Sequence, residues 1–207
     1  MSTISSSETV CGRCGSLATI DCSSHCGDMR YCSMICCDLH RSDHEAVCTA
    51  FKAQEERPAG YPSQDLHYRA ILFPKGDDQP RFVWLKFYQS TMFKPSQSGI
   101  EALIEGPMEK YKTMRPGYEH QWLEIIGRRS VSPDPSQNNK ALAKLLGWEG
   151  SGVWRGNILV IGLIQEEIES IVGVDDEVNN GNTSRVRAPV DLGTRDLACI
   201  LAYFRKT

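Results

Sequence analysis

The sequence of 207 residues lacks a long apolar segment, which argues against a helical membrane protein. Its longest apolar run, Ile158 to Ile164, has seven residues, whereas a membrane-spanning helix needs about 20. The first ten residues, MSTISSSETV, contain neither the basic nor the apolar stretch of a secretory signal. We therefore expect an intracellular protein, in the cytoplasm, the nucleus or both, that makes no contact with a membrane.

An excess of positive charge is also missing. The chain has 23 Lys and Arg against 26 Asp and Glu, a net charge of −3. Residues 1–56 contain four basic and eight acidic side chains. Because affinity for a phosphate backbone depends on clustered Lys and Arg, we expect no direct binding of nucleic acid.

Motifs of common enzyme classes are absent as well. The chain contains no phosphate-binding GxxxxGK[ST] loop, no GxGxxG fingerprint and no GxSxG nucleophile motif. His67 and His120 are far apart in sequence, and the acidic runs at 77–78 and 175–177 have the character of solvated turns. We therefore expect no enzyme; the alternatives are an unrecognised active site in residues 66–207 and a nucleic-acid-associated regulator.

Cysteine is what the sequence has in excess. Eight of its nine cysteines lie between positions 11 and 48, and the ninth is Cys199. Without a secretory signal, thiols at such spacings are more often metal ligands than disulfides. The odd total and a histidine within the pattern also favour metal. The cluster therefore indicates a metal-binding segment.

The candidate ligands form four pairs, whose spacings suit two metal ions. The pairs are Cys11 and Cys14, Cys22 and Cys26, Cys32 and Cys36, and His44 and Cys48. A gap of two residues fits a tight turn, whereas a gap of three places two side chains one helical turn apart, which predicts one or two short helices over residues 32–48. Eight ligands complete two tetrahedral zinc sites with no open position, so the two Zn²⁺ ions are expected to be structural. Spacing alone permits more than one grouping of the four pairs.

Three neighbouring residues offer alternatives to this ligand set. His25 would replace Cys26 if the second pair had a two-residue gap, although zinc in structural sites prefers thiolate. Cys37 follows Cys36 and points about 100° away from it on a helix, so we interpret it as a spare thiol. His40 lies one turn before His44 and is expected to be an exposed polar side chain.

With Tyr31 directly before Cys32, the segment 11–48 resembles a MYND-type zinc finger. The stretch CGDMRYCSMIC and the gap of seven residues between Cys36 and His44 agree with that family. The strings PRFVWLK, WRGNILV and DLGTRDLACILAYF resemble the C-terminal regions of small fungal MYND-finger proteins of undefined role.

The resemblance implies a cross-braced pair of zinc sites. In that arrangement Cys11, Cys14, Cys32 and Cys36 hold one ion, and Cys22, Cys26, His44 and Cys48 hold the other.

The resemblance also implies a protein-interaction module, in some members for proline-containing peptides of the PxLxP type. Those members have glutamine and tryptophan where this chain has Cys37 and Arg41, which puts that peptide in doubt. A SET-type methyltransferase, the enzyme in which some MYND fingers occur, is not expected, because only ten residues precede Cys11 and the tail lacks that enzyme's cofactor motif.

The rest of the chain shows the periodicity of mixed α and β structure. We expect a helix end and a polar linker over 49–65, strands over 68–73, 81–88 and 157–164, a helix over 139–146 that stops at Gly147, and a last helix capped by Thr194. Cys199 and the four tryptophans are expected to contribute to a core.

The sequence thus predicts two parts. Residues 1–10 are expected to be disordered, residues 11–48 to form a small two-zinc cross-braced finger, and residues 66–207 to form an α+β domain with a mostly antiparallel sheet. Only the finger is expected to need metal for folding, because its segment is too small for a large apolar core. The predicted function is a zinc-binding protein whose finger mediates protein–protein interaction, in a regulatory or transcriptional complex.

Overall fold

A computed structural model describes residues 11–14, 16–23, 26–59, 65–88, 94–104, 109–114, 121–129, 138–147, 154–168 and 184–206. The predicted disordered N-terminus, His25, His120, Trp148 and the acidic run 175–177 lie outside these residues. In the described part of the chain, no helix is long and apolar enough to cross a membrane.

The first part of the chain folds as a two-stranded hairpin followed by one helix. Strands β1 (Ile20–Asp21) and β2 (Arg30–Tyr31) pair antiparallel, and helix α1 runs from Met34 to Lys52. The Ser33 hydroxyl caps α1 by accepting a hydrogen bond from the Cys36 backbone N–H at 3.3 Å. The predicted one or two short helices are therefore a single helix of 19 residues that continues past Cys48.

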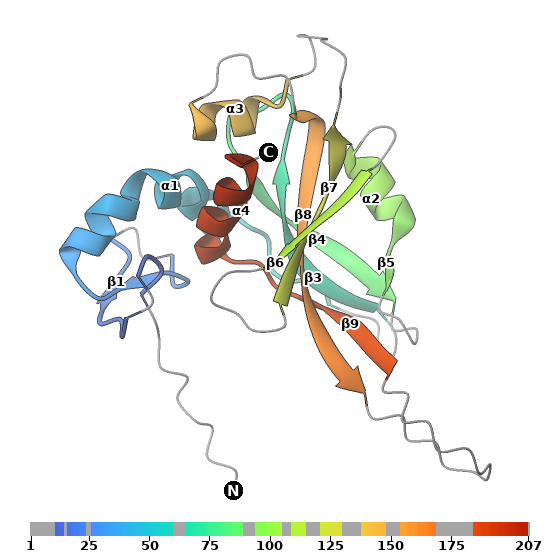
Figure 1. The fold of residues 1–207 in the computed structure, drawn as a ribbon, viewed down its shortest axis with the longest axis horizontal. Helices are drawn as coiled ribbons and strands as arrows, with labels where there is room; N and C mark the ends of the chain where they lie inside the picture. The colour runs from blue at the N-terminus through green and yellow to red at the C-terminus, as the bar shows by residue number, and fades with distance from the viewer. Residues whose placement is uncertain are drawn as a thin grey trace, which may run out of the picture.

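An antiparallel sheet forms the rest of the fold, as predicted (Figure 1). Its order is β5-β4-β3-β8-β7-β6, and β9 pairs with the far end of β8. The strands are β3 (Asp65–Phe73), β4 (Arg81–Tyr88), β5 (Lys94–Pro95), β6 (Glu109–Met114), β7 (Gln121–Arg129), β8 (Trp154–Ile168) and β9 (Ser184–Val190). The predicted strands over 68–73, 81–88 and 157–164 lie within β3, β4 and β8 and are confirmed.

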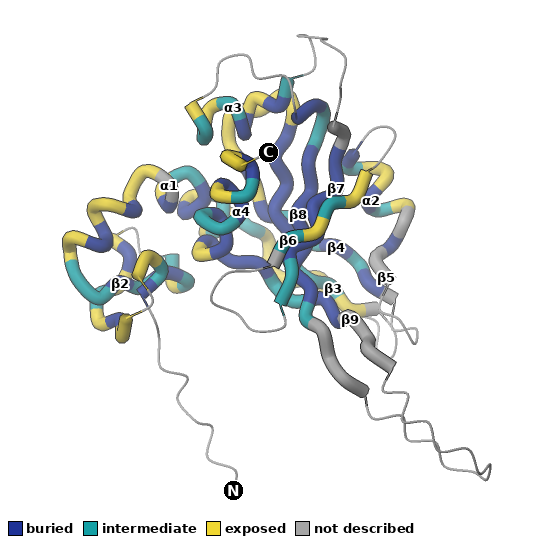
Figure 2. Tube along the Cα trace, viewed as in Figure 1, coloured by how far each residue is buried: buried dark blue, intermediate teal, exposed yellow. Residues whose placement is uncertain are grey.

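Both faces of the sheet are covered, which explains the continuous apolar run in β8. Ile158 and Val160 point into the larger core, with helices α3 (Lys140–Leu146) and α4 (Leu197–Phe204), whereas Leu159 and Ile161 point into a second core with α2 (Gln97–Ile104). A strand that is buried on both faces has apolar residues at every position rather than at alternate ones. Figure 2 shows this burial along the central strands.

The helix predicted over 139–146 is confirmed. Asn139 caps it, and Gly147 ends it with a left-handed φ of +70°. The buried Asn139 side chain also donates hydrogen bonds to the carbonyls of Phe73 and Gly156, both at 2.8 Å. One side chain therefore connects α3 to the ends of β3 and β8.

The prediction that Thr194 caps the last helix is wrong. α4 is preceded by a 3₁₀ turn, η2 (Thr194–Asp196), whose cap is Gly193. The buried Asp196 carboxylate accepts a hydrogen bond from the Gly193 N–H at 2.7 Å. The Thr194 hydroxyl is therefore not needed as a cap and donates to Asp28 instead. Cys199, on α4, is partly buried against the larger core.

The segment expected to be a linker packs on the sheet over its described part. The Trp84 indole N–H donates to the Glu55 carbonyl at 2.9 Å, and Arg57 pairs with Asp191. Beside them, the Arg69 guanidinium lies 4.3 Å from the ring centre of Phe51, near the end of α1. These contacts fix the C-terminal end of α1 against the sheet.

Candidate metal centre

The first cluster of metal-binding side chains joins a turn to the start of α1. Cys11 and Cys14 come from the N-terminal turn, and Cys32 and Cys36 from the residues around the Ser33 cap. The sulfur atoms of Cys14, Cys32 and Cys36 lie 3.5, 3.6 and 3.8 Å apart, and all four ligand atoms of the cluster lie within 4.8 Å of one another. This group could hold one metal ion.

The second cluster joins the loop before β2 to the middle of α1. Cys22 and Cys26 flank a short loop, whereas His44 and Cys48 lie one turn apart on the helix. The Cys22 sulfur is 3.7 Å from that of Cys48 and 2.9 Å from His44 Nε2, which is 3.7 Å from the Cys26 sulfur. All four ligand atoms again lie within 4.8 Å of one another.

These distances fit zinc. Zn–S bonds of about 2.3 Å in a tetrahedron place neighbouring sulfurs about 3.8 Å apart, close to the sulfur–sulfur distances of 3.5 to 3.8 Å in the two clusters. One cluster offers four thiols and the other offers three thiols and an imidazole, which are the ligand sets that structural zinc prefers. The eight predicted ligands are thus brought together in two groups of four, with the first pair joined to the third and the second pair to the fourth.

Thiol acidity in the first cluster varies with the hydrogen bonds that each sulfur accepts or donates. Hydrogen bonds from the Ser16 side chain and backbone lower the pKa of the exposed Cys14 to about 6. Contacts with the thiols of Cys14 and Cys36 instead raise the pKa of Cys32 to about 12. Metal binding must therefore displace protons from the less acidic thiols of the cluster, and it is favoured by higher pH.

In the second cluster, burial controls the protonation of its ligands. Burial, with His40 as a neighbour, lowers the pKa of His44 to about 4, so the imidazole is neutral at pH 7, and its Nε2 faces the sulfurs of Cys22 and Cys26. Burial also raises the pKa of Cys48 to about 12, together with contact to Cys22. The neutral imidazole is the form that a zinc site requires.

His40 is not the exposed side chain that the sequence suggested. It is 4% exposed, its Nδ1 lies 3.1 Å from the Tyr31 hydroxyl, and its ring stacks on His44 with centroids 6.1 Å apart. The prediction was wrong because this face of α1 packs against the hairpin, where Tyr31 is also buried. Both side chains support the second cluster without belonging to it, and the spacing Tyr31-x8-His40 gave no signal of their contact.

Cys37 and the described tryptophans have structural positions. Cys37 is buried in the core of the metal-binding segment and belongs to neither cluster. Trp154 is buried in the larger core, and Trp122 is partly buried against the second one. The Arg57 guanidinium lies over the Trp84 ring, 5.0 Å from the ring centre, near the end of α1.

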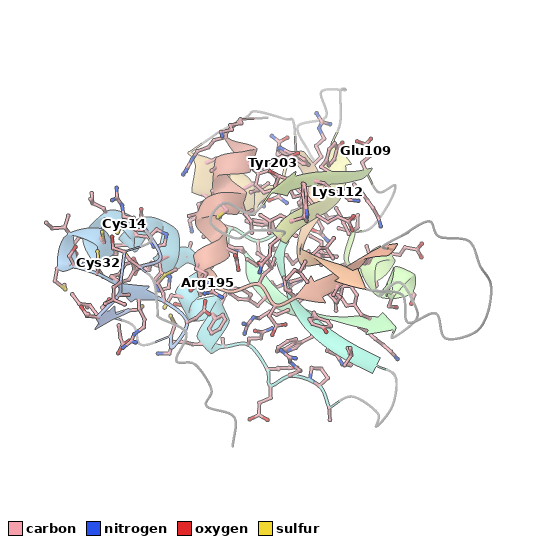
Figure 3. The ribbon with its side chains drawn as sticks, turned by 60° about the horizontal axis from the view of Figure 1, so that its bottom comes forward. Cys14, Cys32, Glu109, Lys112, Arg195 and Tyr203 are labelled. Atoms are coloured by element: carbon pink, nitrogen blue, oxygen red, sulfur yellow. The ribbon has the colours of Figure 1, made fainter. Side chains whose placement is uncertain are left out.

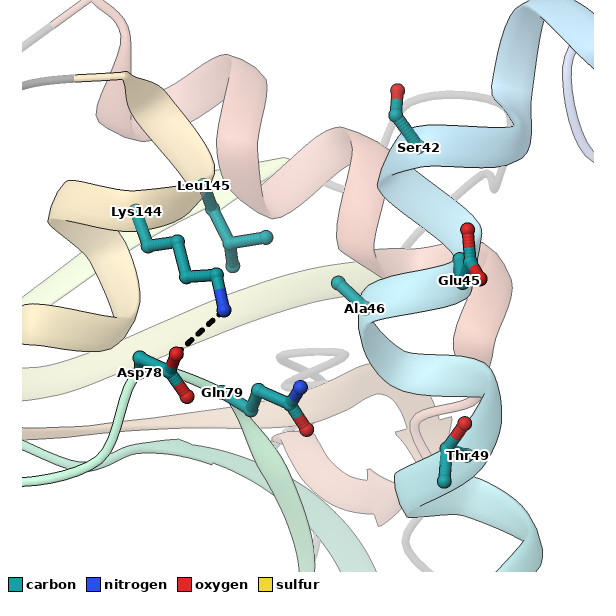
Figure 4. A pocket seen from close by; sticks show the side chains of 8 residues that line it. All are labelled: Ser42, Glu45, Ala46, Thr49, Asp78, Gln79, Lys144 and Leu145. Carbon is teal, nitrogen blue, oxygen red and sulfur yellow. Dashed lines mark hydrogen bonds and ion pairs between the residues drawn. The ribbon is translucent and has the colours of Figure 1, made fainter.

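A pocket of about 540 Å³, lined by polar and apolar side chains, lies where α1 faces α3 and the β3–β4 turn (Figure 4). Its charged side chains are Glu45, Asp78 and Lys144, and the Lys144 ammonium lies 2.5 Å from the Asp78 carboxylate. This hydrogen bond lowers the pKa of Asp78 and keeps it ionised. A general acid needs the opposite shift, so this pair has the character of an ordinary exposed ion pair.

No family model, no curated protein and no solved structure matches this chain. Any function proposed for it therefore rests on the geometry of the two clusters. Figure 3 shows Cys14 and Cys32 close together at the end of the molecule away from the sheet.

Proposed function

We propose that this protein uses a two-zinc, MYND-type, cross-braced finger to bind a protein partner, in a role that is not catalytic. The observation that supports it most is the interleaved grouping of the eight ligands, in which α1 supplies ligands to both clusters. Four protein ligands for each ion leave no coordination position for water or substrate. The metals therefore serve to hold α1 and the hairpin in a fixed arrangement.

The surface that we propose for the partner lies on the first half of α1. Met34, Ile35 and Leu39 are 56%, 70% and 60% exposed, although the same segment buries five of its eight cysteines, Met29 and Tyr31. Apolar side chains held out into solvent by a rigid scaffold are typical of a binding surface. We name Met34, Ile35 and Leu39 the α1 patch.

The apolar patch suits a partner with apolar side chains, and two positions of the fold argue against a PxLxP peptide. Of the two positions that such peptides use in the MYND family, Cys37 is buried and Arg41 is paired with Asp38. These two positions therefore lack the glutamine amide and the tryptophan indole that the peptide-binding MYND fingers have.

Elemental analysis of the purified protein tests the metal part of the proposal. We expect two zinc ions per chain. One ion or none would contradict the two-site arrangement.

Affinity capture with three variants tests the partner surface. Ile35→Glu and Leu39→Glu place a charge within the α1 patch, whereas Leu66→Glu places one on β3, where Leu66 is also exposed. We expect a bound protein to be lost with the first two variants and retained with Leu66→Glu, while all three keep two zinc ions. An unchanged set of bound proteins in the patch variants would contradict this surface.

A further inference from the structure

The loop that supplies Cys26 also reaches the start of the C-terminal helix. Two residues beyond Cys26, the Asp28 carboxylate accepts hydrogen bonds from the Thr194 backbone N–H at 2.5 Å and from the Thr194 hydroxyl at 2.8 Å. Thr194 is completely buried, although 166 residues separate it from Asp28. This contact connects the second metal cluster to η2.

Gly193 shows how closely the loop and η2 approach. A Cβ atom at this position would lie 2.5 Å from one Asp28 carboxylate oxygen and 2.8 Å from the other, so a larger residue would displace the contact. On its other side, the Gly193 N–H donates to the buried Asp196. We name Asp28, Gly193, Thr194 and Asp196 the latch.

The helix that supplies the other two ligands of the cluster reaches the same place. Val47, between His44 and Cys48, is 0% exposed and belongs to the larger core together with Leu197 and Ile200 of α4. α1 packs against both η2 and α4. The two segments that would share one zinc ion therefore reach neighbouring parts of the C-terminal region: the loop contacts η2 through Asp28, and the helix packs in one core with α4 through Val47.

From this juxtaposition we propose that zinc at the second cluster controls the docking of the C-terminal helix. The ion joins the loop to α1, and only the joined pair presents Asp28 and Val47 together to η2 and α4. Loss of the ion separates the two contacts and loosens α4 from the core. This inference rests on the proposed two-zinc finger and adds a regulation of it, and it replaces the expectation that the tail folds independently of the finger.

Thermodynamic linkage allows the coupling between zinc binding and the latch to be measured from a change in η2. If zinc favours the latch, the latch must favour zinc by the same factor. Thr194→Val is isosteric, lies far from every ligand in sequence and removes one of the two hydrogen bonds to Asp28. We expect it to weaken zinc retention at the second cluster about 5-fold or more, the lower end of typical coupling, and to leave the first cluster unchanged.

Asn139→Ala is the matched control. Asn139 is buried and hydrogen-bonded, and its loss weakens the same core at α3, but it does not belong to the latch. A reduction of zinc retention that came only from a less stable fold would also appear in Asn139→Ala, which loses more hydrogen bonds than Thr194→Val.

The experiment uses the full chain loaded with zinc and has two readouts. The first is competition for zinc with a chromophoric chelator in wild type, Thr194→Val and Asn139→Ala. The second is amide hydrogen exchange of residues 192–204 in wild type before and after zinc removal, which needs no variant to fold. We expect weaker retention of one ion in Thr194→Val alone, and faster exchange of α4 after zinc removal.

Two results would overturn the proposal while the proposed function stands: two zinc ions with equal retention in both variants, or α4 exchange that is unchanged by zinc removal. A wild-type protein without zinc would overturn both proposals.

Discussion

At the scale of single residues, Tyr31 and His40 contact each other and pack against His44 of the second cluster. The tyrosine is 1% exposed and its ring packs edge-on against both His40 and His44. Burial raises the pKa of its hydroxyl above the usual range, so the group remains a neutral hydrogen-bonding partner. A metal-binding histidine depends on such neighbours for the orientation of its ring.

Tyr31→Phe is therefore expected to destabilise the protein without removing a ligand. The variant deprives buried His40 of a hydrogen-bond partner, and such losses typically cost about 1–3 kcal/mol. Chemical denaturation of the zinc-loaded protein measures the change, and elemental analysis should still find two zinc ions. A loss of zinc would show that Tyr31 has a larger role than support.

Acid sensitivity follows from His44. Its pKa falls from 6.5 in the unfolded chain to about 4 in the fold, so the unfolded state binds more protons between these values. Stability therefore decreases as the pH is lowered from about 6.5 to about 4, and the full penalty is present below that window.

Denaturation at a series of pH values measures this slope. His44→Cys keeps a fourth donor but removes the imidazole, so its slope in the same window should be smaller by up to one proton. Equal slopes in the two proteins would show that His44 does not titrate as its burial implies.

At the scale of elements, the start of α3 depends on the side chain of Asn139. Asn139 caps the helix and donates to the carbonyls of buried Phe73 and half-buried Gly156, so Asn139→Ala removes three hydrogen bonds. We expect a loss of about 2–4 kcal/mol of unfolding free energy, because a cap is worth about 0.5–2 kcal/mol and buried acceptors left unpaired add to it.

Lys144→Met, on the same helix, is the control for this prediction. It breaks only the exposed pair with Asp78, for which about 0–1 kcal/mol is typical. Similar losses in the two variants, measured by denaturation, would contradict the role assigned to Asn139.

Much of the element pattern could be predicted from local sequence. The β-branched and aromatic runs in β3 and β4, the apolar run in β8 and the Asn139 to Gly147 helix all follow from residue type, periodicity and caps. Other features depend on contacts that local sequence does not encode. Thr194 has the residue type of a helix cap, but Asp196 already holds the Gly193 N–H, and the hydroxyl is used by Asp28 from a distant part of the chain.

At the candidate metal site, too, some features could be predicted from local sequence and others could not. The eight ligand positions follow from spacing and residue type, because thiols and imidazoles in pairs have few other uses. The burial of His40 could not be predicted, since it depends on how the hairpin packs on α1. The exposure of Ile35 and Leu39 is also a property of the fold, because both residues would suit a helix core.

At the scale of the whole molecule, α1 belongs to both parts of the protein. Its Cys36, His44 and Cys48 lie in the two clusters together with cysteines from the N-terminal segment, and Val47 and Phe51 pack in the core of the sheet. A division after residue 48 therefore cuts through one helix.

Val47→Ala tests this shared role. Removing two buried methyl groups costs about 0.8 kcal/mol each, with a further amount for the cavity. We expect a loss of about 2–3 kcal/mol and a single unfolding transition seen equally by a probe of the metal clusters and a probe of the sheet, such as zinc release and far-UV circular dichroism. Two separate transitions would show that the two parts unfold independently.

The central claim is the interleaved grouping of the ligands into two zinc sites. It is tested most directly by counting zinc in two double variants by native mass spectrometry. Cys14→Ser with Cys36→Ser removes two ligands from one cluster, whereas Cys14→Ser with Cys26→Ser removes one from each. Our account predicts one zinc ion in the first double variant and none in the second. The reverse result, none in the first and one in the second, would show that consecutive pairs share each ion and would contradict the account.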